Sequence, residues 1–170
     1  MLNIGRLEYQ KNHFDLLHIF SRLHSYEPDL RLLIVGSGSY YNAIMSLAKD
    51  LNILSFIHII PYTSDVRSLF QASHLYLHTA HYEGFGNVLL EAMYFKVPIV
   101  SYLCRGGPRM FNQNNTNLLT VTPGDVSSYV LSVLDLLHNT TLYSMLQKNA
   151  YNESLNYSVS AIAERYIESL

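Results

Sequence analysis

Short apolar runs alternate along the chain with segments whose apolar residues recur at helical spacing. Residues 30–35 are apolar almost throughout, which is typical of a strand buried on both faces of a parallel sheet. Residues 13–23 carry their apolar side chains close to the period of a helix. The pattern predicts strands at 2–4, 30–35, 55–60, 75–78, 97–102 and 118–121. It predicts helices at 13–23, 40–51, 65–72 with Ser64 as N-cap, and 87–95, a short one at 106–108, and a helical tail in two or three pieces after 123–125.

This alternation of strands and helices predicts an α/β fold, a Rossmann-like parallel sheet flanked by helices. At 170 residues and without a visible linker, the chain is expected to form one domain over residues 1–170. In such sheets ligands bind beyond the carboxyl ends of the strands. Glycine-bearing turns fall at four of these ends, at Gly5, Gly36 and Gly38, Gly84 and Gly86, and Gly106 and Gly107.

Composition narrows the class of protein further. The net charge is −2 and no basic run is present, so nothing favours a nucleic-acid partner. The single cysteine, Cys104, excludes an internal disulfide framework and fits a reducing compartment. No apolar run reaches the roughly 18 residues of a membrane-spanning helix, and Met1 leads directly into the first strand without a signal peptide. The expected location is the cytoplasm.

The strongest candidate site is the segment in which Glu83 and Glu91 bracket Gly84-Phe85-Gly86-Asn87. It follows a predicted strand and opens a predicted helix, where free backbone N–H groups bind anions and phosphate above all. The two carboxylates add acceptors for the hydroxyls of a sugar or ribose. The alternative is an ordinary strand-to-helix connection with two solvated glutamates.

Two cations form a second candidate group. Arg6 follows Gly5 at the end of the first strand, and Lys11 precedes the first helix. Both can reach an anion held over the strand ends, Arg6 as a fork and Lys11 as a point charge. The alternative is a pair of solvated surface cations, as most arginines and lysines are.

Four weaker patterns are weighed as well. Gly36-Ser37-Gly38 is a partial match to a dinucleotide fingerprint, and a simple tight turn explains it equally well. The loop 104–109 is interpreted as the edge of the site or as a plain connection into a short helix. His74, His78 and His81 approach a metal-like spacing, but core or surface histidines are the better interpretation than a zinc site. Cys104 lacks a nearby base, which disfavours a nucleophilic role.

Taken together, these motifs resemble the carboxyl-terminal, donor-binding domain of a GT-B glycosyltransferase of the large retaining family 4 (group 1). The resemblance covers nearly the whole chain, and the Glu-x7-Glu element with its Gly-Phe-Gly core is its most specific part. The matching segments are 4–7 with Lys11, 33–38, 82–93, 97–100, 106–108 and 123–125. One departure is Met110, which stands where the family often carries an acidic residue.

The resemblance implies a role for each candidate residue. Arg6 and Lys11 would hold the donor diphosphate and neutralise it as it leaves, Glu91 would bind the ribose and Glu83 the donor sugar. The expected donor-binding residues are Gly5, Arg6, Lys11, Pro61, Tyr62, Glu83, Gly84, Phe85, Gly86, Asn87 and Glu91, with Glu83, Arg6 and Lys11 as the catalytic group. No Asp-x-Asp is present, which agrees with transfer that needs no metal or other cofactor.

The implied reaction moves a hexosyl group from a UDP- or GDP-linked sugar to a glycan or lipid acceptor. The family's acceptor-binding amino-terminal domain is missing from this sequence, so the isolated chain is expected to bind donor but to transfer poorly, if at all. That domain could also bring the protein to the inner face of the membrane. Two alternatives stay open: a non-catalytic nucleotide-sugar-binding subunit that works with a partner chain, and a nucleotide-sugar epimerase.

Overall fold

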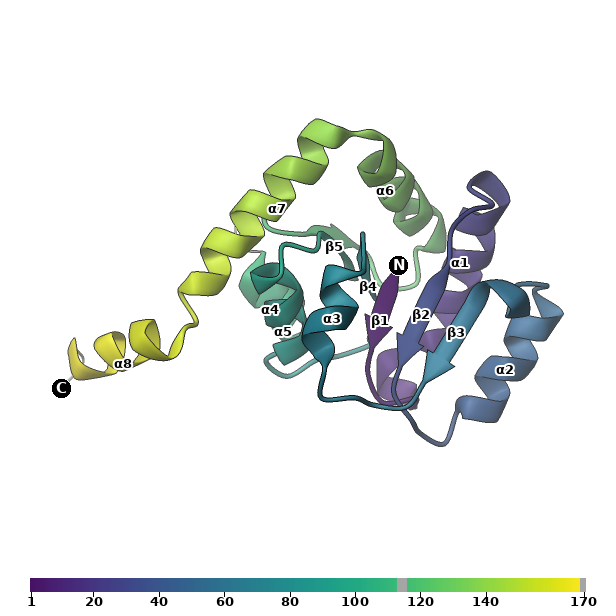
Figure 1. The fold of residues 1–170 in the computed structure, drawn as a ribbon, viewed down its shortest axis with the longest axis horizontal. Coiled ribbons are helices and arrows are strands. Elements are labelled where there is room, and N and C mark those ends of the chain that lie inside the picture. The colour runs from purple at the N-terminus through teal and green to yellow at the C-terminus, as the bar shows by residue number, and fades with distance from the viewer. Residues whose placement is uncertain (113–115, 169–170) are drawn as a thin grey trace.

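The computed structural model describes residues 1–112 and 116–168 and contains one six-stranded sheet with the order β3-β2-β1-β4-β5-β6 (Figure 1). Every pairing within the sheet is parallel. The strands are β1 (Leu2–Ile4), β2 (Leu32–Val35), β3 (Ile57–Ile60), β4 (Tyr76–His78), β5 (Ile99–Tyr102) and β6 (Leu119–Val121). The helices are η1 (Tyr9–Lys11), α1 (His13–Tyr26), α2 (Tyr41–Asp50), η2 (Leu54–Phe56), α3 (Val66–Gln71), α4 (Asn87–Tyr94), α5 (Gly107–Phe111), α6 (Val126–His138), α7 (Thr140–Leu155) and α8 (Val159–Glu168).

The predicted parallel α/β sheet is confirmed, with corrections at the ends of its elements. The strand expected at 55–60 begins only at Ile57, because residues 54–56 form the 3₁₀ helix η2. The N-cap of α3 is Asp65 and not Ser64, since the Asp65 carboxylate accepts a hydrogen bond of 3.2 Å from the backbone N–H of Ser68. The sequence pattern also missed η1, which lies between β1 and α1.

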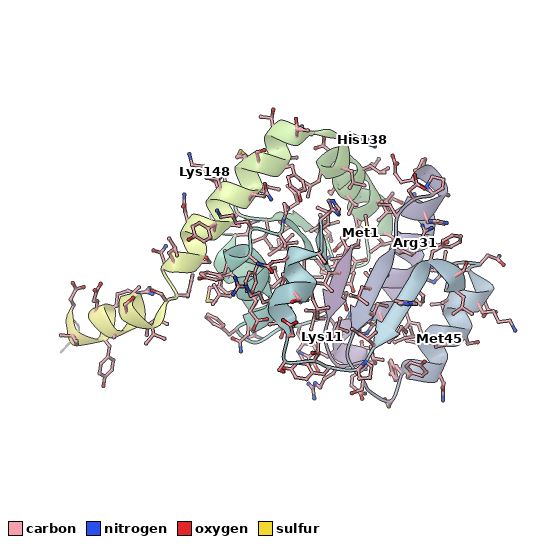
Figure 2. The ribbon with its side chains drawn as sticks, in the orientation of Figure 1. Met1, Lys11, Arg31, Met45, His138 and Lys148 are labelled. Atoms are coloured by element: carbon pink, nitrogen blue, oxygen red, sulfur yellow. The ribbon has the colours of Figure 1, made fainter. Side chains whose placement is uncertain are left out.

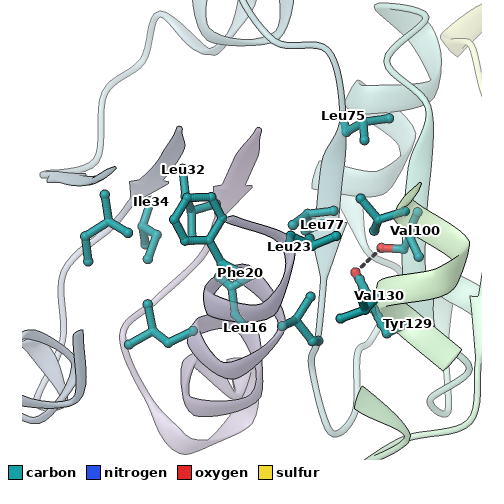
Figure 3. Close-up of a cluster of buried hydrophobic side chains, with 14 of the residues drawn as sticks. Leu16, Phe20, Leu23, Leu32, Ile34, Leu75, Leu77, Val100, Tyr129 and Val130 are labelled. Atoms are coloured by element: carbon teal, nitrogen blue, oxygen red, sulfur yellow. Dashed lines mark hydrogen bonds between the residues drawn. The ribbon is translucent and has the colours of Figure 1, made fainter. Parts of the chain in front are cut away.

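Alternate residues along the strands point to opposite faces of the sheet and contribute to two hydrophobic clusters, one on each face. On one face Leu32 and Ile34 of β2 pack with α1, α2 and α6, and Figure 3 shows Phe20 and Leu23 of α1 in this cluster. There the hydroxyl of Tyr129 also donates to the carbonyl of Val100. On the opposite face the cluster draws its residues from α3, α4 and α5, while α7 contributes to both clusters.

The strand order changes direction between β1 and β4, which are neighbours in the sheet although they lie far apart in the chain. After β1 the chain turns into α1 on one face, and after β4 it turns into α4 on the other. The two connections therefore diverge at the carboxyl edge, and such a switch point is where parallel sheets bind their ligands. Figure 2 shows Lys11 at this edge, with Met1 and Arg31 toward the opposite edge.

The chain ends in α8, which extends away from the sheet and contains no buried residue (Figure 1). Within residues 1–112 and 116–168, no helix is both long and apolar enough to cross a membrane.

His13, the first residue of α1, makes stability depend on pH. Its side chain is 1% exposed, and neither ring nitrogen has a hydrogen-bond partner among the described residues. Burial, followed by the charge of Lys11, lowers the pKa of His13 from 6.5 to about 4. The unfolded chain therefore binds this proton at a higher pH than the folded chain does. The contribution of His13 to stability is complete above pH 6.5 and is lost as the pH falls to about 4.

Between pH 6.5 and about 4, the free energy of unfolding of the wild-type chain is expected to fall by roughly 2–3 kcal/mol more than that of His13→Leu. Urea unfolding at pH 7, 6, 5 and 4 measures this, with His18→Leu at an exposed position of the same helix as the matched control. Equal slopes for His13→Leu and the wild-type chain would contradict the assignment.

Candidate functional site at the carboxyl edge

Two oppositely charged side chains meet at this switch point. Lys11 ends η1 and Glu83 lies in the loop after β4, and the ammonium of Lys11 donates a hydrogen bond to Oε2 of Glu83. Both side chains are largely buried, at 14% and 13% exposure. Gly5 allows this path, because a Cβ on Gly5 would lie only 3.0 Å from side-chain carbons of Lys11. The structure therefore brings together the Gly5, Lys11 and Glu83 of the sequence prediction.

His78 joins this pair and was not assigned to the site from the sequence. It is the last residue of β4, it is 3% exposed, and its Nε2 lies 3.3 Å from Oε2 of Glu83. The only signal in the sequence was a polar residue at the end of an apolar strand directly before the Glu83 loop.

The carboxyl of Glu83 is held in its ionised form. Burial acts to raise its pKa, but hydrogen bonds from His78 and Lys11, together with the charge of Lys11, outweigh burial and lower the pKa to about 2. Glu83 is thus an anion at neutral pH, and its other oxygen, Oε1, has no hydrogen-bond partner among the described residues.

The backbone of the Glu83 loop is fixed by the next loop along the sheet. Tyr82 forms a parallel bridge with Arg105, and the N–H of Glu83 donates to the carbonyl of Arg105 at 3.0 Å. Gly106 has a φ of 106°, and a Cβ there would lie 1.7 Å from the carbonyl oxygen of Glu83. The glycine pair at 106–107 therefore allows close backbone packing beneath Glu83, a role that the sequence interpretation of this loop as the edge of the site did not include.

The N-terminus of α4 is open. Among the described residues, the backbone N–H groups of residues 84–88 have no hydrogen-bond acceptor. They are the groups that a helix start offers to an anion. The Phe85 ring packs edge-on against Phe111 and Tyr157, at centroid distances of 5.3 and 5.7 Å, so Phe85 can contribute to the site through its backbone.

Glu91 lies one turn inside α4 and is half-buried, and burial raises the pKa of its carboxyl. Burial, and after it the charges of Glu83 and Glu91, raises the pKa of Tyr76, whose hydroxyl donates to the carbonyl of Ile4 at 3.1 Å. Both carboxylates therefore act on one buried phenol, which belongs to the first residue of β4 and reaches the last residue of β1. Asn87, by contrast, is exposed as the first residue of α4.

Arg6 lies apart from the Lys11–Glu83 contact. It is exposed, and its guanidinium donates to the side chain of Gln10 at 3.0 Å, while Gln10 in turn donates to the carbonyl of Tyr82 at 3.1 Å. These bonds tie the segment after β1 to the loop after β4. Arg6 is thus held at the carboxyl edge, with its charge available to solvent.

A hollow of about 310 Å³ lies at the ends of β2 and β3. Pro61 lines it together with the 36–38 turn and Tyr41, whereas Tyr62 is 70% exposed and does not line it. A larger hollow, of about 600 Å³, lies at the opposite edge of the sheet beside Met1 and Arg31. We place the site at the carboxyl edge because the charged pair and the open helix start are there.

The remaining sequence candidates make no metal or thiol site. In the described part of the chain, no three histidine, cysteine or acidic side chains are grouped to hold a metal ion. His81 stacks on Tyr9 at 4.5 Å. Burial raises the pKa of Cys104 to about 11, so its thiol is protonated at neutral pH. Met110 packs partly buried against the hydrophobic cluster of α3, α4 and α5.

The fold defines a Rossmann-like α/β domain, and the candidate site lies at its switch point. The sequence model of the glycosyl transferases group 1 matches residues 1–153, and the chain belongs to this family. It is 30% identical over 166 residues to an uncharacterized glycosyltransferase of Haemophilus influenzae, covering 98% of this chain and 47% of that protein.

Two solved structures show the same fold. HepE of Anabaena in complex with UDP matches with a TM-score of 0.90 and 21% identity, over 99% of this chain and 47% of HepE. The C-terminal domain of the group 1 glycosyl transferase LpcC from Francisella tularensis matches with a TM-score of 0.82 and 18% identity, over 93% of this chain and 86% of that domain. The chain thus spans about half the length of its Haemophilus relative.

Proposed function

We propose that this chain is the donor-binding, carboxyl-terminal half of a retaining glycosyltransferase that moves a hexosyl group from a nucleotide sugar to a glycan or lipid acceptor. The observation that carries the proposal is the Lys11–Glu83 contact across the switch point, beside the open N-terminus of α4. The near-complete match to the C-terminal domain of LpcC supports the assignment to the carboxyl-terminal half.

The diphosphate would lie between Lys11, Arg6 and the N–H groups at the start of α4. Each of these donors favours negative charge, and the charge of the departing nucleoside diphosphate would be neutralised by groups already in place. On this account the transfer needs no metal ion. Glu83 would accept a hydroxyl of the donor sugar on Oε1, because Oε2 is already bound by Lys11 and His78.

The nucleoside would extend from the phosphates toward the ends of β2 and β3. Glu91 would accept the ribose hydroxyls, and the hollow beside Pro61 and Gly36 would take the base. Tyr62 remains a proposed contact, since its ring is 70% exposed and follows Pro61, which lines the hollow. UDP is the first candidate because HepE, with the same fold, was solved with UDP.

An exposed aromatic surface at the same edge fits a partner domain that brings the acceptor. Its residues follow β1, β3 and β4 and are Tyr9, Tyr62, Tyr82 and Phe85, exposed by 62%, 70%, 53% and 42%. Exposed apolar surface of this kind marks contact with another protein surface. The same surface also fits the alternative of a nucleotide-sugar-binding subunit that works with a partner chain.

Calorimetric titration of the purified chain tests the proposal. The ligands are UDP, GDP, ADP and their glucose conjugates, with and without EDTA, and the 2′-deoxy form of the nucleotide that binds. We expect selective binding of one nucleotide that EDTA does not change and that loss of the 2′-hydroxyl weakens. No binding by a folded chain, or binding abolished by EDTA, would contradict the proposal. Release of an epimerised nucleotide sugar would instead establish the epimerase.

A further inference from the structure

His78 bridges two polar side chains in a buried setting. It is the register partner of Ser101 on the neighbouring strand β5, so both side chains lie on the same face of the sheet. Nδ1 of His78 lies 3.0 Å from Oγ of Ser101, and Nε2 lies 3.3 Å from Oε2 of Glu83. Ser101 is 0% and His78 3% exposed, which excludes bulk water as a competing partner for either side chain.

The number of protons available to Ser101, His78 and Glu83 limits how these side chains can be hydrogen-bonded. The single hydroxyl proton of Ser101 can be donated either to Nδ1 of His78 or to the carbonyl of Tyr102 at 2.8 Å. In the first arrangement the Ser101 hydroxyl donates to the carbonyl of Tyr102. Nδ1 of His78 must then carry the proton of a neutral ring, and the lone pair of Nε2 faces the carboxylate of Glu83. In the second arrangement the Ser101 hydroxyl donates to Nδ1, so a neutral ring carries its proton on Nε2 and donates a hydrogen bond to Glu83.

The second arrangement is favoured, because the first would set the lone pair of Nε2 against the ionised carboxylate of Glu83 at 3.3 Å, and the two would repel each other. Burial lowers the pKa of His78 and outweighs the hydrogen bond and the charge of Glu83, which act to raise it, while the positive charge of Lys11 acts in the same direction as burial. The other titratable groups nearby are Tyr76, Cys104 and Tyr129, and burial raises the pKa of each, so all three are neutral at pH 7. The ring of His78 is therefore neutral and serves Glu83 as an N–H donor.

We propose that His78 is a positioning residue for Glu83: its Nε2–H, with the tautomer set by Ser101, holds Oε2 together with Lys11 and leaves Oε1 free for a ligand hydroxyl. A carboxylate bound on one oxygen by two donors from different elements is restricted to one rotamer. Its free oxygen is then preorganised, which reduces the ordering cost on ligand binding. The part of this inference that concerns the ligand rests on the proposed function.

Nitrogen NMR of the wild-type chain tests the tautomer directly and needs no ligand and no variant. At pH 7 we expect the His78 ring to carry its proton on Nε2 and none on Nδ1. A proton on Nδ1 alone, or a doubly protonated ring, would overturn the proposal.

Two matched substitutions test the effect on Glu83. The amide nitrogen of His78→Gln reaches near the position of Nε2, whereas that of His78→Asn reaches only about as far as Nδ1. Carbon NMR of the Glu83 carboxyl is expected to show a pKa higher than the wild-type value by about 1 pH unit in His78→Asn and a nearly wild-type pKa in His78→Gln. An equal pKa in all three proteins would mean that His78 only fills space.

The same variants separate positioning from folding. We expect His78→Asn to bind the nucleotide sugar about tenfold more weakly while its affinity for the free nucleotide changes by less than about twofold, and His78→Gln to restore the difference. Equal losses for both ligands in both variants would overturn the inference. If the wild-type chain binds no nucleotide sugar, the proposed function fails, and the two NMR measurements still decide the role of His78.

Discussion

Replacing Arg6 and Lys11 together with alanine is expected to weaken the binding of UDP to this chain by at least about 100-fold. Each cation would make a charge-assisted hydrogen bond to the diphosphate, and a bond of this type contributes about 1.5–3 kcal/mol net. Lys11 has a second effect, because its removal leaves the buried Glu83 carboxylate without its counter-ion and directs a negative charge at the phosphates. Calorimetry with UDP measures the loss.

The matched control is the double variant Arg22→Ala with Lys49→Ala. It removes the same net charge from exposed positions on α1 and α2, away from the carboxyl edge. We expect this control to bind UDP within about twofold of the wild-type chain, since exposed charges more than a Debye length of about 8–10 Å away are screened. Normal UDP affinity in the Arg6 and Lys11 variant would place the phosphate site elsewhere on the molecule.

Gly106→Ala is expected to destabilise the chain by about 3 kcal/mol or more and to abolish donor binding in the fraction that folds. Two costs add at this position. The φ of 106° is strained for any residue with a Cβ, and that Cβ would overlap the carbonyl oxygen of Glu83 at 1.7 Å. Both contacting atoms belong to the backbone, so relief requires the Glu83 loop to move away from Gly106 and the Glu83 carboxylate to leave Lys11.

Urea unfolding and UDP-glucose binding measure the two effects. Gly84→Ala is the matched control from the same pair of loops, because a Cβ there would meet no atom within 4 Å. Its free energy of unfolding is expected to stay within about 0.5 kcal/mol of the wild-type value. A Gly106→Ala chain that unfolds at the wild-type urea concentration would show that the two loops are not rigidly packed.

The strands were predictable because each is a short apolar run bounded by turn residues, but their ends were not. Residues 30–35 read as one strand, whereas β2 begins at Leu32. Ladder bonds require a partner on the neighbouring strands, and Leu32 is the first β2 residue with a partner, Ile57 of β3. The Ser64 error has a similar origin, since serine and aspartate cap helices about equally well and only the path of the chain selects Asp65.

Within the candidate site, the groups that could be predicted were those whose position follows from the order of strands, turns and helices along the chain. Glu83, the open start of α4 and Gly5 with Lys11 each follow a strand, which places them at the carboxyl edge in any parallel sheet. His78 was missed because its significance depends on Ser101 and Glu83, which come from a neighbouring strand and a following loop. The packing role of Gly106 was missed for the same reason, since the atom it approaches belongs to Glu83.

The sequence by itself determined the class of fold, the edge of the sheet at which the candidate site lies, and the residue types available there. These properties follow from hydrophobic periodicity and from the order of strands, turns and helices along the chain. Only the tertiary structure decided that β1 and β4 are neighbours, and hence that Lys11 and Glu83, 72 residues apart, share a contact. Strand neighbours are chosen by how the helices on both faces bury their apolar sides together, and no local pattern encodes that choice.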